Sequence, residues 1–205
     1  IKNHNKKNSN ASFYNQRDLP EKHNHIVIDL SKNLKIIYND PRRFGYFKLL
    51  NNNFINEKPF NQLGPDPFKL DFNFFYIKKN IKNKKINVKS LLMDQSFVRG
   101  IGNIYANEIL FKSHISPYRV SSKLTNSNIN SILKNSKKIL KKAILFGGSS
   151  IRDFKKSDGK LGNFQRNFKV YGKQNVSCPR NKCVGILKKV IINNRSAFFC
   201  AECQI

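Results

Sequence analysis

Acidic side chains are scarce in this sequence, and long apolar runs are absent. The 205 residues include 12 Asp and Glu against 39 Lys and Arg, which gives a formal net charge of +27. This imbalance favours a polyanionic partner, although Asn, Lys and Ile are abundant throughout and compositional bias accounts for part of it. No apolar segment has the length of a membrane span, and none has the pattern of a signal peptide. We therefore expect no membrane association.

Cysteine is missing until position 178, and all four cysteines follow the pattern Cys178-x4-Cys183-x16-Cys200-x2-Cys203. Such clustering indicates a local metal site in a reducing compartment, not a disulfide framework. Two closely spaced pairs of thiols are typical of tetrahedral zinc, so we predict one structural Zn²⁺. The β-rich segments 186–192 and 196–199 predict a two-stranded zinc ribbon, which the metal would hold folded.

The stretch 91–111, LLMDQSFVRGIGNIYANEILF, carries two glycines between apolar segments. Gly100 and Gly102 predict a tight turn, and the apolar residues after them have helical spacing. Asn103 stands where an N-cap belongs, and Glu108 lies inside the helix that it would start. The pattern predicts a helix, a glycine turn and a second helix. Such a turn presents N–H groups that suit a phosphate; the alternative is a helical hairpin whose glycines serve packing only.

Three strands are predicted before this stretch. Residues 26–30 and 34–38 alternate in polarity around a hairpin turn, and residues 45–50 have the composition of a third strand. Between the second and third strands stands Asp40-Pro41-Arg42-Arg43-Phe44-Gly45. One interpretation is an ordinary turn. However, two arginines followed by a phenylalanine leave an aromatic ring at a loop tip, which core packing does not require.

Two further helices are predicted. Residues 68–79 have an aromatic face of Phe72, Phe75 and Tyr76, for which core packing is the simplest role. Pro117 is expected to end the helix begun at Asn103. A longer helix over residues 126–146 has an apolar face assigned to the core, with a glycine pair at its end. The long glycine-punctuated loop over residues 147–167 is of a kind that is functional or disordered in compact domains.

These stretches together resemble the formamidopyrimidine-DNA glycosylase (Fpg/Nei) family. Residues 98–108 are similar to its helix–two-turn–helix element, DPRRFG to its wedge turn, and FFCAECQ near the C-terminus to the end of its zinc finger. The resemblance implies an α+β fold with a remnant of an antiparallel β-domain, a helix–two-turn–helix domain and a C-terminal zinc ribbon. The expected boundaries are 1–60, 61–167 and 168–205.

The resemblance also implies site residues. It assigns DNA contacts to His23, Arg42, Arg43, Phe44, Lys84, Asn103 and Arg195. In the family the counterparts of Arg42 and Phe44 enter the duplex and fill the gap left by the everted base, which requires a flat apolar wedge and a cation. Lys84 is chosen from a run of six lysines by its distance from Met93. Arg195 would bind the lesion phosphate and donate a proton in the second elimination, which makes it the one catalytic residue assigned.

The chain departs from the family pattern at three places. Its first cysteine pair is separated by four residues where the family usually has two, and Asn163 stands where a tyrosine is frequent. The family nucleophile is the amine of an N-terminal proline followed by glutamate, which attacks the sugar C1′. This chain begins Ile1-Lys2-Asn3, without an initiator methionine, and has no proline before Pro20.

We therefore expect the C-terminal part of a bifunctional DNA glycosylase and AP lyase that acts on oxidised purines, inactive by itself because the nucleophile is missing. Two alternatives stay open: a naturally truncated, non-catalytic, zinc-dependent DNA-binding module, and a basic zinc-ribbon protein that binds RNA. The expected partner is damaged double-stranded DNA. We expect a monomer in the bacterial cytoplasm, associated with the nucleoid through DNA binding.

Overall fold

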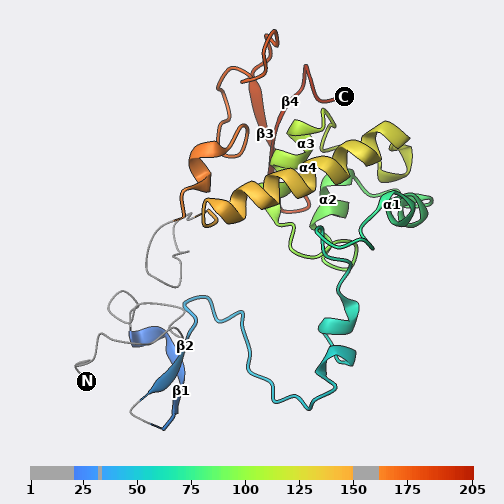
Figure 1. Ribbon diagram of the computed structural model, residues 1–205. Coiled ribbons are helices and arrows are strands. Elements are labelled where there is room, and N and C mark those ends of the chain that lie inside the picture. The colour runs from blue at the N-terminus through green and yellow to red at the C-terminus, as the bar shows by residue number, and fades with distance from the viewer. Residues whose placement is uncertain (1–20, 32–33, 150–161) are drawn as a thin grey trace.

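The computed structural model describes residues 21–31, 34–149 and 162–205. Figure 1 shows a β-hairpin near the N-terminal end and, set apart from it, a larger group of helices that carries a second β-hairpin. The described residues form four α-helices and two antiparallel two-stranded sheets. The predicted α+β fold class is therefore confirmed. Short 3-10 helices complete the described elements, at Glu21–His23, Phe54–Asn56, Phe60–Gln62, Ser121–Lys123 and Phe164–Asn167.

The first hairpin consists of β1 (Asn24–Asp29) and β2 (Lys35–Asn39), with Val27 opposite Ile37. These bounds agree with the predicted pair of strands. The predicted third strand at residues 45–50 is wrong: the segment is irregular, and Leu49 is fully exposed. A β-strand requires a hydrogen-bonded neighbour, and within the described residues nothing pairs with this segment.

Helix α1 spans Phe74–Ile81 and starts later than the predicted residue 68. The reason is a local cap, because the Asn73 side chain accepts a hydrogen bond from the Tyr76 N–H at 2.9 Å. The predicted aromatic face is wrong in one member. Phe72 is buried just before the helix, whereas Phe75 is exposed to solvent.

Helices α2 (Val88–Met93) and α3 (Asn103–Lys112) flank the glycine turn, which confirms the predicted helix–turn–helix. Gly102 is the N-cap residue of α3, so the expectation for Asn103 was wrong by one position, and Asn103 is the first helical residue. Pro117 does not end α3. The helix stops earlier, because His114 adopts a left-handed φ of 60° that a continuing helix cannot accommodate.

Helix α4 (Asn126–Leu145) is the longest described helix and confirms the fourth predicted helix. Thr125 and Asn128 form a capping box at its start. Gly147 and Gly148 follow its end with positive φ. Its apolar face packs on α1 and α3, except that Ile144 is exposed. Most of the predicted loop after α4 lies outside the described residues.

The second hairpin, β3 (Leu187–Ile192) and β4 (Arg195–Cys200), confirms the two-stranded ribbon. Two hydrophobic clusters hold this half of the molecule together. The larger one lies among α1–α4, and the smaller one joins the ribbon to Phe111 of α3 and Val170 of the preceding linker. No helix in the described parts of the chain has both the length and the apolarity to cross a bilayer.

Candidate metal centre and nucleic-acid interface

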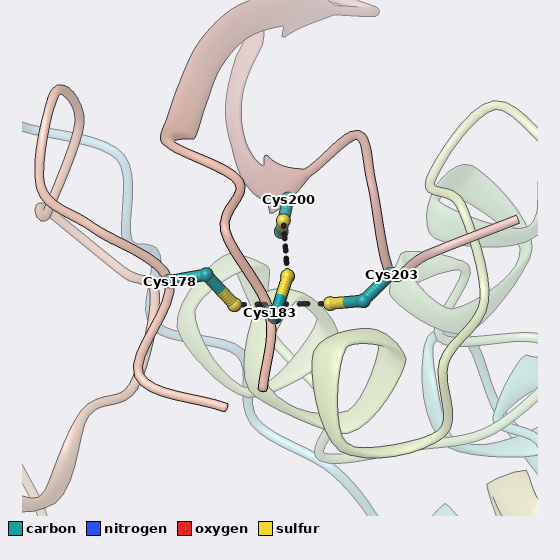
Figure 2. A group of neighbouring side chains, drawn as sticks. All are labelled: Cys178, Cys183, Cys200 and Cys203. Carbon is teal, nitrogen blue, oxygen red and sulfur yellow. Dashed lines mark hydrogen bonds between the residues drawn. The ribbon is translucent and has the colours of Figure 1, made fainter. Parts of the chain in front are cut away.

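The four predicted metal ligands converge at the base of the β3–β4 hairpin. Figure 2 shows their sulfur atoms pointing toward one another from two knuckles, and all four lie within 4.8 Å of each other. The Cys178–Cys203 and Cys183–Cys200 sulfur pairs are 3.8 and 3.7 Å apart. A tetrahedral zinc with Zn–S bonds of about 2.3 Å requires sulfurs about 3.8 Å apart. The residues therefore fit the ion.

The surroundings of the sulfurs favour a bound cation. Burial raises the pKa of the Cys178 thiol to about 12, so a thiolate there needs a positive partner. The backbone N–H of Gly185 lowers the pKa of Cys183. Gly185 is also required sterically, because a Cβ at this position would lie 2.6 Å from the Cys200 sulfur. The second strand could not approach the knuckle so closely with any other residue.

The longer first knuckle has a structural role that its spacing does not reveal. It contains Arg180, whose Nη2 donates a hydrogen bond to the Phe111 carbonyl at the C-terminal end of α3, 2.5 Å away. The guanidinium lies 4.6 Å from the Phe111 ring centroid and also bonds the His114 ring. A cation at the C-terminus of a helix is favourable. The extra knuckle residues thus attach the metal centre to α3.

The far tip of the hairpin is attached to the start of α2. Asn193 and Asn194 form the turn, with left-handed φ values of 48° and 58°. The Asn193 side chain donates to the Ser90 hydroxyl at 2.8 Å, and the Lys89 ammonium donates to the Arg195 carbonyl at 3.4 Å. These bonds hold the backbone at Arg195, while the Arg195 side chain stays exposed.

The sequence did not single out Lys89, the lysine whose ammonium contacts the Arg195 carbonyl. It is 1% exposed, and burial, followed by the charge of Arg195, lowers its pKa to about 8. Lys84, the lysine chosen from the run, is partly exposed, and its own carbonyl accepts a hydrogen bond from the Ser122 N–H. The sequence could have indicated that Lys89 is buried. It stands three residues before Leu92, and residues three apart lie on the same face of a helix, which here is the buried face.

Two buried polar residues of α3 orient the ribbon. The Asn107 side-chain oxygen accepts a hydrogen bond from the Phe198 N–H of β4 at 2.7 Å. The Glu108 carboxylate accepts hydrogen bonds from three successive backbone N–H groups of the linker that leads into the ribbon, those of Lys169, Val170 and Tyr171, at 2.9–3.0 Å. Because both residues are nearly inaccessible, these bonds act in a medium of low dielectric constant.

The glycine turn is held by one side chain. The Gln95 oxygen accepts a hydrogen bond from the Gly100 N–H at 2.8 Å, and the Gln95 amide donates to the Ile101 carbonyl at 3.0 Å. Gly100 has a φ of 84°, which favours glycine. Asn103 follows at the N-terminus of α3, half-buried. The first N–H groups of a helix have no partner within it, so they are available to an anion.

The DPRRFG turn is organised by Asp40. Its carboxylate accepts hydrogen bonds from the N–H groups of Arg42, Arg43 and Gly45 and from the Tyr38 hydroxyl. These bonds, that of Gly45 first, lower the pKa of Asp40 to about 2. Asp40 is therefore ionised at neutral pH, and its hydrogen bonds define the conformation of the turn.

The side chains that this turn presents are a cation and an aromatic ring in contact. The Arg42 guanidinium lies 4.8 Å from the Phe44 ring centroid, and Phe44 is 78% exposed. His23 is adjacent, since its carbonyl accepts the Asp40 N–H at 3.0 Å. The structure thus brings His23, Arg42, Arg43 and Phe44 to one end of the first hairpin. Asn103 is the first residue of α3 and Arg195 the first residue of β4, and both elements belong to the larger group that Figure 1 shows apart from the first hairpin.

Three kinds of comparison, with family models, with related sequences and with solved structures, give the same family. Residues 63–155 match the family model described as the formamidopyrimidine-DNA glycosylase H2TH domain. The chain is 40% identical over 195 residues to the formamidopyrimidine-DNA glycosylase of Roseobacter denitrificans, covering 95% of this chain and 69% of that protein. It is 41% identical over 187 residues to the enzyme of that name from Wolbachia of Brugia malayi, covering 89% and 66%.

Solved structures agree. The MutM (Fpg) protein of Thermus thermophilus matches with a TM-score of 0.80 and 31% identity, over 90% of this chain and 70% of that chain. Lactococcus lactis Fpg in complex with DNA containing an abasic site matches with a TM-score of 0.80 and 32% identity, over 91% and 68%. With the glycine turn between α2 and α3, the four-cysteine ribbon and these relatives all in agreement, the chain belongs to the formamidopyrimidine-DNA glycosylase family.

Proposed function

We propose that this chain is the DNA-binding part of a base-excision repair enzyme that removes oxidised purines and then cleaves the abasic strand. The observation that carries the proposal is the placement of Arg195. Its backbone is held by Lys89 and the Asn193–Ser90 bond at the tip of the ribbon, while its side chain remains free to meet a phosphate. Family membership supplies DNA glycosylase chemistry, and the geometry supplies an exposed guanidinium on a backbone that Lys89 holds.

In this proposal, two anion sites lie on neighbouring elements. Asn103 and the first N–H groups of α3 contact one stretch of DNA backbone, and Arg195 contacts the phosphate at the lesion. Asn107 links the two, because its amide donates to the Asn103 carbonyl at 2.7 Å and its oxygen accepts from Phe198 of β4. Phosphate contacts of this kind determine register on the duplex and carry no sequence information.

The DPRRFG turn supplies the wedge. The stacked Arg42 and Phe44 would enter the duplex together, the ring filling the space of the extruded base and the guanidinium facing the orphaned partner base. Arg43 and His23 would contact the flanking backbone. Because Asp40 fixes the turn before DNA binds, little conformational entropy would be lost on insertion.

Zinc is the proposed cofactor. Cys178, Cys183, Cys200 and Cys203 would hold one structural ion, which fixes the two knuckles and so the position of the hairpin that carries Arg195. We propose three units: the first hairpin within residues 1–60, the helix–two-turn–helix unit over residues 61–167, and the ribbon over residues 168–205. We further propose that the protein acts as a monomer.

Binding of damaged DNA and cleavage of the glycosidic bond require different groups in this proposal. Excision in this proposal needs an amine nucleophile of low pKa at the sugar C1′, and these 205 residues contain no counterpart of the N-terminal proline and glutamate expected from the family. Lys89 has a lowered pKa, but its Nζ is turned to the Arg195 carbonyl inside the protein. We therefore propose that these residues recognise damaged DNA and do not break the glycosidic bond alone.

Borohydride trapping on a duplex with an abasic site tests the proposal. We expect the 205-residue chain to bind this duplex but to give no more covalent product than a basic protein without glycosylase activity. A chimera that adds the N-terminal segment of a relative, beginning with proline, should be trapped efficiently. Arg195→Ala should weaken binding, and Lys188→Ala, which changes an exposed lysine toward the other end of the same hairpin, serves as its control. Equal losses in both variants would contradict the role of Arg195.

A further inference from the structure

A second basic surface lies away from the residues assigned to damaged DNA. It is a cavity of about 610 Å³ between α3, α4, the linker that follows the 3-10 helix Phe164–Asn167, and the first knuckle of the metal centre. The cations that line it are Lys112, Lys134, Lys138, Lys142, Lys169 and Arg180. Lys112 is the last residue of α3 and Asn103 is the first, so the cavity lies about 13 Å along the helix from the glycine turn.

The charge of this cavity is unbalanced. Glu108 is the one acidic residue that lines it among the described residues, and its oxygens already accept the linker N–H groups. Within the described parts of the chain, none of the six cations forms an ion pair with a carboxylate. Burial lowers the pKa of Lys112, and the positive charges of Lys138, Arg180, Lys142 and Lys169 lower it further. Lys112 therefore lies close enough to these cations for their charges to disfavour its own.

Three of the lysines form a line. Lys134, Lys138 and Lys142 are spaced by four residues on α4, so they share one face of the helix and extend over about 12 Å. All three are exposed. An elongated row of mobile ammonium groups suits a chain of phosphates, because each contact needs charge and little geometry.

The apolar floor of the cavity argues against a protein partner. Phe111, Ile139 and Phe164 line the cavity, yet they are only 6%, 8% and 4% exposed. Binding hot spots of protein interfaces are dominated by large side chains that bury against the partner, and this floor offers almost no such area. What the cavity does offer is cationic side chains on a concave surface.

We propose that this cavity binds the backbone of a second DNA segment, separate from the segment that carries the lesion. The contact would hold the protein near DNA while the lesion-binding surface is occupied or released. It uses none of the residues assigned to lesion recognition, so its success or failure can be measured independently of the proposed repair function.

The experiment uses the 205-residue chain saturated with a short duplex that contains an abasic-site analogue. A second, undamaged, fluorescently labelled duplex is then added, and its binding is followed by anisotropy over a range of salt concentrations. Sedimentation velocity counts the duplexes for each protein. We expect two duplexes per chain.

The test variant is Lys138→Gln/Lys142→Gln, and the matched control is Lys137→Gln/Lys141→Gln. The control removes two exposed lysines of the same helix that do not line the cavity. Each lost phosphate contact lowers affinity about eight-fold at 0.1 M salt, so the test variant should bind the second duplex about 60-fold more weakly. Its log–log salt slope should fall by about 1.8. The control should change affinity much less.

Three outcomes would overturn the inference: one duplex per chain, equal losses in the two variants, or cavity-dependent binding of polyglutamate without binding of a second duplex. The last would assign the cavity to an acidic protein. Arg195→Ala separates this test from that of the proposed function, because it should weaken binding of the first duplex and leave the second unchanged.

Discussion

Replacing Glu108 with alanine removes the acceptor for three successive backbone N–H groups of the linker. Lys169, Val170 and Tyr171 donate to its carboxylate at 2.9–3.0 Å, and Glu108 itself is 5% exposed. A hydrogen bond to a charged group contributes about 1.5–3 kcal/mol, so three such bonds set an upper range of about 5–9 kcal/mol. Lys169 is exposed, and its N–H can be hydrated after truncation. We therefore expect the free energy of unfolding to fall by about 3–5 kcal/mol.

Glu108→Gln distinguishes hydrogen bonding from simple packing. The glutamine oxygen can still accept the three N–H groups, but without the charge, so the loss should be about 1–2 kcal/mol. Glu21→Ala, which removes an exposed glutamate in the 3-10 helix before β1, should change stability by less than about 0.5 kcal/mol. Urea unfolding followed by circular dichroism measures all three variants in the presence of zinc.

The refuting result is specific. If Glu108→Ala lost less than about 1 kcal/mol, the three N–H groups would have found other partners, and Glu108 would not be the attachment of the ribbon linker to α3. If Glu108→Gln lost no stability, the negative charge would contribute nothing. The first result would mean that the smaller hydrophobic cluster and the Arg180 contacts hold the ribbon without help from Glu108.

Two further predictions concern the metal and pH. Cys200→Ser should abolish binding of zinc and weaken binding of duplex DNA, because one of the four metal ligands is lost and the metal no longer fixes the base of the hairpin. Elemental analysis measures the zinc, and a binding titration measures the affinity for DNA. A variant that kept its zinc would contradict the assignment. Lys89→Met should weaken DNA binding without loss of stability near pH 7. The pKa of Lys89 is lowered to about 8 in the folded state, against an ordinary value of about 10.4. The cost of burying its charge is fully present below pH 8 and disappears as the pH rises toward the ordinary value, so the stability of the wild type should rise relative to Lys89→Met over that interval. Parallel pH profiles of the two proteins would refute the burial of a charged Lys89.

Local patterns were enough for much of this protein. Helical spacing around Gly100 and Gly102 predicted α2, the turn and α3, because the constraint is a backbone conformation that glycine adopts without strain. The cysteine spacing predicted a four-sulfur cluster, because zinc coordination permits few arrangements of two knuckles. The sequence also predicted the β1–β2 hairpin and the capped helix α4.

The errors in the predicted helix and strand boundaries have causes that the hydrophobic periodicity of the sequence does not indicate. A side-chain cap at Asn73 moved the start of α1, and a left-handed residue at His114 stopped α3 before Pro117. The segment 45–50 has strand composition but no neighbour among the described residues. A strand depends on partners elsewhere in the chain, and its own composition cannot supply them.

By itself, then, the sequence determined the helix–turn–helix, the four-cysteine cluster and the chemical character of the DPRRFG turn, since each depends on residues close together in the chain. Only the tertiary structure decided which lysine supports Arg195, because Lys89 and the hairpin tip are brought together by packing across a long stretch of sequence. The tertiary structure also decided that Glu108 accepts hydrogen bonds from the linker. It brought lysines of α3, α4 and the linker to one cavity. The physical reason is the same in each case: a side chain's charge and partners depend on what the fold places around it, and that environment comes from distant residues.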